Sequence, residues 1–121
     1  YKVLLVDDND FNIMLIRQMV IDILPESIIF ESKNGREAIE QYNIEKPDLI
    51  FMDVQMPELN GHEATQIIRS LEKGLHIPII ALTAGTNTAE LNLCLESGMN
   101  DVITKPFLSN ELVKIIFKWL K

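Results

Sequence analysis

Basic residues, cysteine and long apolar runs are scarce in this sequence, and each shortage excludes a class of protein. Eleven basic residues stand against 18 acidic ones, a formal net charge of −7, so nucleic acid and anionic lipid would repel the chain. The only cysteine is Cys94, which excludes an internal disulfide and favours a reducing, cytoplasmic setting. No apolar run approaches the roughly 18 residues of a membrane span, and no basic-then-apolar start resembles a signal peptide. We therefore expect a domain that neither binds nucleic acid directly nor inserts into a membrane.

What remains is the composition of one globular domain. The chain has 121 residues, of which 47% are hydrophobic and 24% charged, values typical of a single folded unit. It begins Tyr1-Lys2-Val3, without an initiator methionine, and enters an apolar pattern almost at once. We expect residues 1–121 to form one domain taken from a longer protein.

Short apolar runs alternate with longer segments of helical pattern. The runs predict buried strands at 3–6, 28–30, 49–52, 77–82 and 102–103. The segments predict helices at 11–24, 35–45, 61–72, 87–97 and 109–120. Asn34-Gly35, Asn60-Gly61 and Ser97-Gly98 mark boundaries, and Ser109 is expected to cap the last helix.

Strict alternation with short connections requires parallel strands joined by right-handed crossovers. The predicted fold class is therefore α/β, a doubly wound parallel sheet of five strands with five helices. Ligands of such sheets bind beyond the carboxyl ends of the strands. The residues that follow each strand are therefore the candidates for a site.

Polar side chains of complementary chemistry follow four of the five strands. Asp7 and Asp8 follow the first strand, Asp53 the third, Thr83 the fourth and Lys105 the fifth. Three carboxylates this close would raise one another's pKa values unless a cation lay among them. Mg²⁺, a hard ion that prefers oxygen ligands, fits best.

Each of these residues alone has an ordinary structural explanation, such as a helix cap for Asp7-Asp8 or a solvated charge for Lys105. Their joint placement at one edge favours function. A cation, a lysine and a hydroxyl that converge on one point would bind a phosphoryl group. Asp53 would then be the nucleophile and would hold the phosphate as an aspartyl phosphate.

Four stretches of the sequence carry a family resemblance. They are Val6-Asp7-Asp8-Asn9, Phe51-Met52-Asp53-Val54-Gln55-Met56-Pro57, Leu82-Thr83-Ala84 and Thr104-Lys105-Pro106-Phe107. In order and spacing the chain resembles the response-regulator receiver domains over essentially its whole length. The resemblance implies the flavodoxin-like strand order 2-1-3-4-5 and a signalling domain that catalyses its own phosphorylation.

The resemblance also implies roles for the acidic residues. Asp53 matches the phosphoacceptor of the family. Asp8, Asp53 and the backbone carbonyl of Gln55 match the direct Mg²⁺ ligands, and Asp7 matches a residue that acts largely through a bound water. The implied cofactor is therefore Mg²⁺.

The residues of the last two strands match the family in all but one position. Thr83 resembles the hydroxyl that reorients toward the phosphoryl group, and Lys105 resembles the lysine that pairs with that group. Pro106 stands where the family has a cis peptide. Val102, however, occupies a position that is commonly aromatic, so we expect a weaker coupling between Thr83 and the outer face.

Asp8-Asn9 followed by Asn12 looks most like the receivers of hybrid sensor histidine kinases. The implied partner is a histidine kinase or a histidine-containing phosphotransfer protein. The implied location of this domain is cytoplasmic, including the cytoplasmic side of a membrane-bound sensor kinase. The sequence does not determine the signal, the output, the lifetime of the phosphate or the oligomeric state.

The first predicted helix has two apolar faces, which suggests a docking surface. One face carries Ile13, Ile16, Val20, Ile23 and Leu24. The opposite face carries Phe11, Met14 and Leu15 with Gln18 beside them. If the first face packs on the sheet, the second faces solvent and, together with Pro106, can accept a partner helix. The alternative is that neighbouring helices cover it.

Three other functions stay open at this point. A haloacid-dehalogenase-type phosphohydrolase also forms an aspartyl phosphate, but it usually has a second aspartate two residues after the nucleophile, where this chain has Gln55. A degenerate receiver would bind partners without being phosphorylated, although no acidic residue, Thr83 or Lys105 is lost. A flavin-binding fold would need Ser, Thr and Gly residues in the loop after the first strand to hold a phosphate, and this loop lacks them.

His62 and His76 are expected to be surface residues outside any metal-binding set.

Overall fold

Strands and helices alternate from one end of the protein to the other, as the sequence predicts. The computed structural model describes residues 1–56, 59–72, 76–85, 88–105 and 107–120. The elements are β1 Lys2–Val6, α1 Asp10–Ile23, β2 Ile28–Ser32, α2 Gly35–Glu45, β3 Leu49–Asp53, α3 Gly61–Leu71, β4 Ile79–Thr83, α4 Thr88–Glu96, β5 Asp101–Thr104 and α5 Ser109–Trp119. Within these ranges no helix has both the length and the apolar character needed to cross a membrane.

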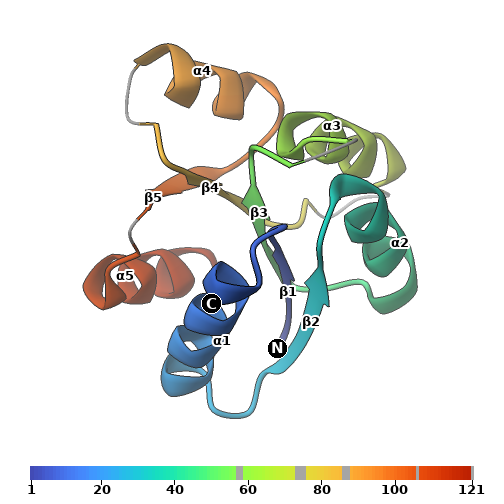
Figure 1. Cartoon of the computed structure of the whole chain (residues 1–121). Coiled ribbons are helices and arrows are strands. Elements are labelled where there is room, and N and C mark those ends of the chain that lie inside the picture. The colour runs from blue at the N-terminus through green and yellow to red at the C-terminus, as the bar shows by residue number, and fades with distance from the viewer. Residues whose placement is uncertain (57–58, 73–75, 86–87, 106, 121) are drawn as a thin grey trace.

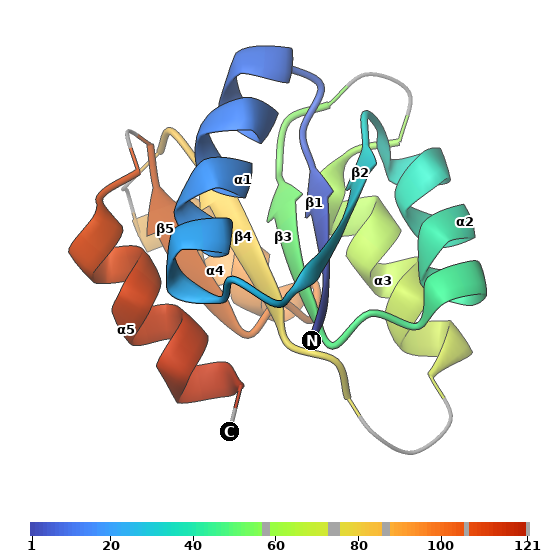
Figure 2. The same ribbon diagram turned by 90° about the horizontal axis from the view of Figure 1, so that it is seen from below.

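All five strands form one parallel sheet. Their order is β2-β1-β3-β4-β5, which confirms the predicted fold class and topology. Figures 1 and 2 show α1 and α5 on one side of the sheet and α2 and α3 on the other. The strands therefore have both faces covered, which is why their sequences are continuously apolar rather than alternating.

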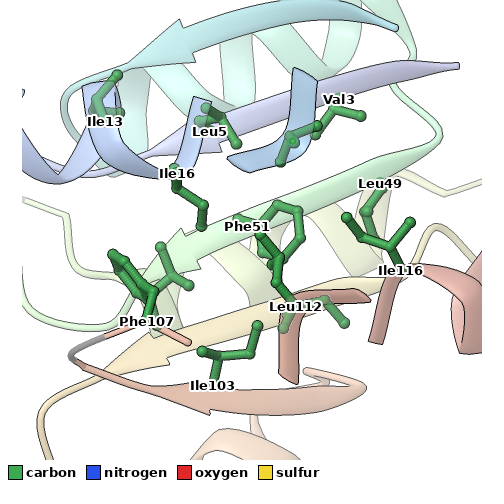
Figure 3. Close-up of a cluster of buried hydrophobic side chains, with 13 residues drawn as sticks. Val3, Leu5, Ile13, Ile16, Leu49, Phe51, Ile103, Phe107, Leu112 and Ile116 are labelled. Carbon is green, nitrogen blue, oxygen red and sulfur yellow. The ribbon is translucent and has the colours of Figure 1, made fainter. Parts of the chain in front are cut away.

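Each face of the sheet carries its own hydrophobic core. On the side of α1 and α5, Phe51 lies between Leu5, Ile16 and Leu112, as Figure 3 shows. On the other side, residues of β1, β3 and β4 pack against Ala38, Ala64, Ile68 and Cys94. Since the central strands are fully buried between these cores, their carboxyl ends are held in a fixed arrangement.

Side-chain caps set the starts of α1, α2 and α3. The Asn60 side chain accepts a hydrogen bond from the Glu63 N–H, and the Glu63 carboxylate accepts one from the Asn60 N–H, a reciprocal capping box. The expectation that Ser109 caps α5 is wrong, because the capping position is Leu108 and no side chain bonds there. The packing of α5 is seen instead in Leu112 and Ile116, which are fully buried.

Asn60→Ala should lower the free energy of unfolding by about 1 kcal/mol, because it removes the acceptor of the capping box. Urea denaturation monitored by circular dichroism would measure the change. Asn110→Ala, at an exposed position in the first turn of α5, is the matched control and should be close to neutral. Equal losses in both variants would contradict the role of the cap.

Candidate functional site

The register of the sheet brings the predicted residues to one edge. Val6 pairs with Met52, so Asp7 and Asp53 follow paired residues on neighbouring strands. Asp53 in turn pairs with Leu82, the residue before Thr83. The Lys105 N–H donates to the Thr83 carbonyl at 2.8 Å, which fixes the backbone of the lysine beside the end of β4.

A pocket of about 220 Å³ opens at this edge. It is lined by Asp7, Asp8, Asn9, Asn12, Asp53, Val54, Gln55, Ala84 and Lys105. The three acidic residues and the lysine predicted from the sequence therefore share one cavity. Thr83 precedes Ala84 in the chain but is not among the residues that line the pocket. Its side chain is buried, and its hydroxyl accepts a hydrogen bond from the Gly85 N–H at 3.0 Å.

The pocket holds more negative than positive charge. The Lys105 ammonium lies 3.3 Å from Asp7 Oδ2 and 3.5 Å from Asp53 Oδ2, so one cation is shared between two carboxylates. Asp7 and Asp53 are 1% and 4% exposed, whereas Asp8 is exposed. Water therefore screens the two inner carboxylates poorly.

Burial and mutual repulsion make ionisation of Asp53 unfavourable. Its pKa is raised to about 6, chiefly by desolvation and next by the negative charge of Asp7. The Gln55 N–H and the Lys105 ammonium lower the pKa of Asp53 but do not offset these two causes. A bound cation would lower the pKa of Asp53 and so favour its ionised form.

Local turns hold the carboxylates in fixed orientations. Asp7 Oδ1 accepts a hydrogen bond from the Asn9 N–H at 2.9 Å, and Asp53 Oδ1 accepts one from the Gln55 N–H at 3.1 Å. Each bond closes an Asx turn that orients the side chain against its own loop. The Oδ2 atoms of both residues are directed toward Lys105.

The donor set fits a hard divalent cation. One carboxylate oxygen from each of Asp7, Asp8 and Asp53 lies within 4.8 Å of the other two. Asp7 Oδ2 is buried and accepts no hydrogen bond from the described residues, even though Lys105 is close enough for an ion pair. An all-oxygen set with spare lone pairs and excess negative charge is the environment that Mg²⁺ requires.

Two contributors to the site were missed by sequence reasoning. Asn12 lines the pocket from the first turns of α1. Gly61 packs so closely under β3 that an added Cβ would overlap the Asp53 carbonyl oxygen and lie 3.0 Å from its carbonyl carbon. A side chain at that position would displace the end of β3, so Gly61 acts in placing Asp53. The only signal was the Asn60-Gly61 pair, which we interpreted as a helix boundary.

The apolar stripe of α1 faces outward. Phe11, Met14 and Leu15 are 63%, 59% and 36% exposed, while Ile13, Ile16 and Val20 on the opposite face are buried. Gln18 is also exposed and bonds Asp22 at 3.0 Å. The alternative that neighbouring helices cover the stripe is therefore wrong for the described residues. Pro106, the fifth expected docking residue, lies outside them.

The expectation for one of the two histidines also needs correction. His76 is exposed, but the His62 side chain is only 14% exposed and lies beside Ser97 and Glu90. Val102 is partly buried and lines a pocket of about 530 Å³ between α4 and α5. Val102 stands where the family that the sequence resembles commonly has an aromatic residue, and in this protein that position lies beside a pocket.

Comparison with known proteins identifies the family. The family model of the response regulator receiver domain matches residues 3–117. The chain belongs to this family. The receiver domain is thus a signalling domain of two-component systems, with the strand order and the acidic edge described above.

The receiver domain is similar to parts of larger kinases. It is 38% identical over 121 residues to the sensor histidine kinase GacS of Pseudomonas protegens, an alignment that covers 98% of this chain and 13% of the kinase. The chain therefore spans only a small fraction of the length of that relative.

Two solved structures have the same fold with a TM-score of 0.87. One is the receiver domain of the sensor histidine kinase PA1611 from Pseudomonas aeruginosa, with a magnesium ion coordinated in its active site cleft (36% identity, 98% of this chain and 95% of that one). The other is the receiver domain of the response regulator Ssk1, in a co-crystal with the histidine phosphotransfer protein Ypd1 from Saccharomyces cerevisiae (33% identity, 98% of this chain and 87% of that one).

Asp53→Asn should stabilise the metal-free domain by about 1–3 kcal/mol above pH 7, because it removes a buried charge beside Asp7. The folded-state pKa of Asp53 is raised from 3.8 to about 6. The folded state therefore binds the proton more tightly, and its stability falls as the pH rises through that window. The difference in unfolding free energy between the variant and the wild type should consequently vanish near pH 4. At neutral pH, Mg²⁺ should reduce this difference, because it stabilises the wild type.

Urea denaturation at both pH values, with and without Mg²⁺, would measure these differences. Glu40→Gln, which removes an exposed carboxylate on α2, is the control and should change stability little. An asparagine variant that is less stable than the wild type at neutral pH without metal would contradict the repulsion between Asp7 and Asp53.

Proposed function

We propose that this receiver domain takes a phosphoryl group from a phosphohistidine onto Asp53 and thereby passes on a signal. The observation that supports this most directly is the pocket in which a buried, rigidly held Asp53 faces Asp7, Asp8 and Lys105. An oxygen of Asp53 attacks the phosphorus, and a P–O bond forms as the P–N bond breaks. The electron pair of the broken bond returns to the imidazole nitrogen of the donor.

Asp7, Asp8, Asp53 and the backbone carbonyl of Gln55 are the proposed holders of Mg²⁺. When bound, the ion supplies positive charge that screens Asp53 from the incoming phosphoryl oxygens. Asp7 and Asp53 are kept in place by their turns, so little reorganisation is needed when a phosphoryl group arrives. The backbone carbonyl of Gln55 is included because the sequence matches the family at this position, and the N–H of the same residue donates to Asp53 Oδ1.

Lys105 and Thr83 are the proposed partners of the bound phosphoryl group. The Lys105 ammonium already lies within ion-pair distance of Asp53 and can neutralise the charge on the phosphoryl oxygens. The Thr83 hydroxyl accepts a hydrogen bond from the Gly85 N–H, so a rotation of Thr83 toward the phosphate would disturb that contact. Such a move would alter the position of Gly85 and, with it, the surface beside α4.

A phosphohydrolase is less well supported than a signalling domain. The residue two positions after Asp53 is Gln55, which cannot act as a general acid and base. Its backbone is also tied to Asp53 by the Gln55 N–H. We therefore infer that the domain catalyses only its own phosphorylation and that its parent chain is a cytoplasmic, hybrid-kinase-like protein, in keeping with the similarity to GacS.

Incubation with Mg²⁺ and phosphoramidate should add one phosphoryl group to the domain, detected by intact-mass spectrometry. Phosphoramidate is chosen because its P–N bond imitates that of phosphohistidine. Asp53→Asn and treatment with EDTA should both abolish the gain, and Lys105→Ala should slow it at least tenfold. Full labelling of Asp53→Asn would sink the assignment, whereas no labelling of the wild type would favour a receiver that only binds.

The exposed stripe of Phe11, Met14 and Leu15, with Gln18 beside it, is the proposed docking surface for the phosphohistidine protein. It lies on α1, whose first turn contributes Asn12 to the pocket, so a helix docked there would bring its histidine near Asp53. Adaptable side chains such as Met and Phe suit a helical partner. Pro106 is included in the proposal because it follows Lys105 in the chain.

Met14→Glu should slow transfer from a phosphorylated histidine phosphotransfer protein by about tenfold or more, since a buried charge at an interface costs upwards of 1.4 kcal/mol. A time course of quenched samples, with the labelled phosphoryl group on the donor protein at the start, would measure the rate of phosphoryl transfer. Ile44→Glu is the matched control, because Ile44 is 71% exposed on α2, far along the chain from the proposed surface. Equal slowing by both variants would argue against docking on α1.

A further inference from the structure

Three side chains with different metal-binding atoms meet between α3 and α4, outside the acidic pocket. They are His62 in the first turn of α3 and Glu90 and Cys94, one helical turn apart on α4. A ligand atom of each lies within 4.8 Å of the other two. This arrangement corrects the expectation that His62 lies outside any metal-binding set, which arose because His62 is far from both partners along the chain.

The ring of His62 is held in a defined orientation. The Ser97 hydroxyl donates a hydrogen bond to the Cys94 carbonyl at 2.8 Å, since a carbonyl can only accept. Toward His62 Nδ1, 3.3 Å away, the same hydroxyl can therefore act only as an acceptor. The proton of the neutral ring consequently lies on Nδ1, and Nε2 carries the lone pair.

The lone pair of Nε2 is directed at the Glu90 side. Nε2 lies 3.8 Å from Glu90 Oε1, which is too long for a direct hydrogen bond. In a tetrahedral zinc site, Zn–N and Zn–O bonds of about 2.0–2.2 Å place the nitrogen and the oxygen roughly 3.3–3.6 Å apart. The observed 3.8 Å is only slightly longer, so a small approach of the two side chains would let them share an ion. A hydrogen bond from the second ring nitrogen is the usual support of a ligating histidine.

Cys94 adds the ligand that selects the metal. It is fully buried, and it is the only cysteine of the chain. A set of one nitrogen, one oxygen and one sulfur excludes Mg²⁺ and favours Zn²⁺ and related borderline ions.

We propose that His62, Glu90 and Cys94 form a second metal site, for Zn²⁺ or a similar transition-metal ion, that fastens α4 to α3. Water or another small ligand would complete the tetrahedron, as it does at zinc sites with three protein ligands. Ser97 is a positioning residue for His62.

The site would also act on the loop that follows Thr83. An added Cβ at Gly85 would lie 3.3 Å from Glu90 Cγ, so Glu90 packs directly against this loop. A metal bound to Glu90 would therefore hold α4 against Gly85, whose N–H donates to the Thr83 hydroxyl, a link to phosphorylation that rests on the proposed function.

Cobalt(II) is the probe that tests the proposal, because a cobalt–thiolate bond gives a charge-transfer band in the near ultraviolet. The reduced, EDTA-stripped domain is titrated with CoCl₂ in excess Mg²⁺, which occupies the acidic pocket. We expect one equivalent of cobalt to produce the band and Zn²⁺ to displace it. Since the chain has one cysteine, the band can arise only from Cys94.

Variants separate a built site from a thiol that binds metal alone. His62→Ala and Glu90→Gln should each weaken cobalt binding at least tenfold, and Ser97→Ala should weaken it by a smaller factor. His76→Ala, which removes the other histidine, should leave the titration unchanged. Each variant is checked for wild-type circular dichroism.

Two results would overturn the proposal. One is the absence of a charge-transfer band in the wild-type domain. The other is wild-type affinity in both folded variants, His62→Ala and Glu90→Gln. If a variant fails to fold, thermal unfolding of the wild type in excess Mg²⁺ provides the test. Zn²⁺ should raise the midpoint temperature, and an unchanged midpoint would contradict the proposed site.

Discussion

The Asp7 and Asp53 carboxylates approach each other inside the protein, and the parallel sheet prevents them from moving apart. Each follows or ends a strand that is buried on both faces, so separating them would require the packing of two cores to be disrupted. Lys105 alone cannot neutralise both. The edge of the sheet is thus an environment in which added positive charge is stabilising, and the proposed chemistry depends on that imbalance.

Much of the fold could be predicted because its constraints are local or periodic. The apolar runs identified all five strands to within a few residues, and the Asn-Gly pairs marked the starts of α2 and α3. The edge residues could be predicted as well, since parallel strands must deliver their carboxyl ends to the same side. Asp7, Asp8, Asp53 and Lys105 therefore met in one pocket as expected.

The failures concern contacts between segments far apart in the chain. Ser109 has the chemistry of a cap, but Leu108 occupies the capping position, and α5 is packed into the distant core through the buried residues Leu112 and Ile116. Gly61 matters because α3 presses on the Asp53 carbonyl, a distance that no local pattern encodes. The surroundings of His62 depend on how α4 packs beside α3, which the weakly amphipathic sequence of α4 did not reveal.

The order of the strands divides the site between two parts of the sheet. The carboxylates come from β1 and β3, which are neighbours near the middle of the sheet, whereas the hydroxyl and the ammonium come from β4 and β5 toward one edge. The surface around α4, β5 and α5, including the space beside Val102, belongs to the second part. Substitutions there would change the surface that other proteins meet while leaving the spacing of Asp7 and Asp53 intact, so the acidic pair and the outer surface can be altered independently of each other.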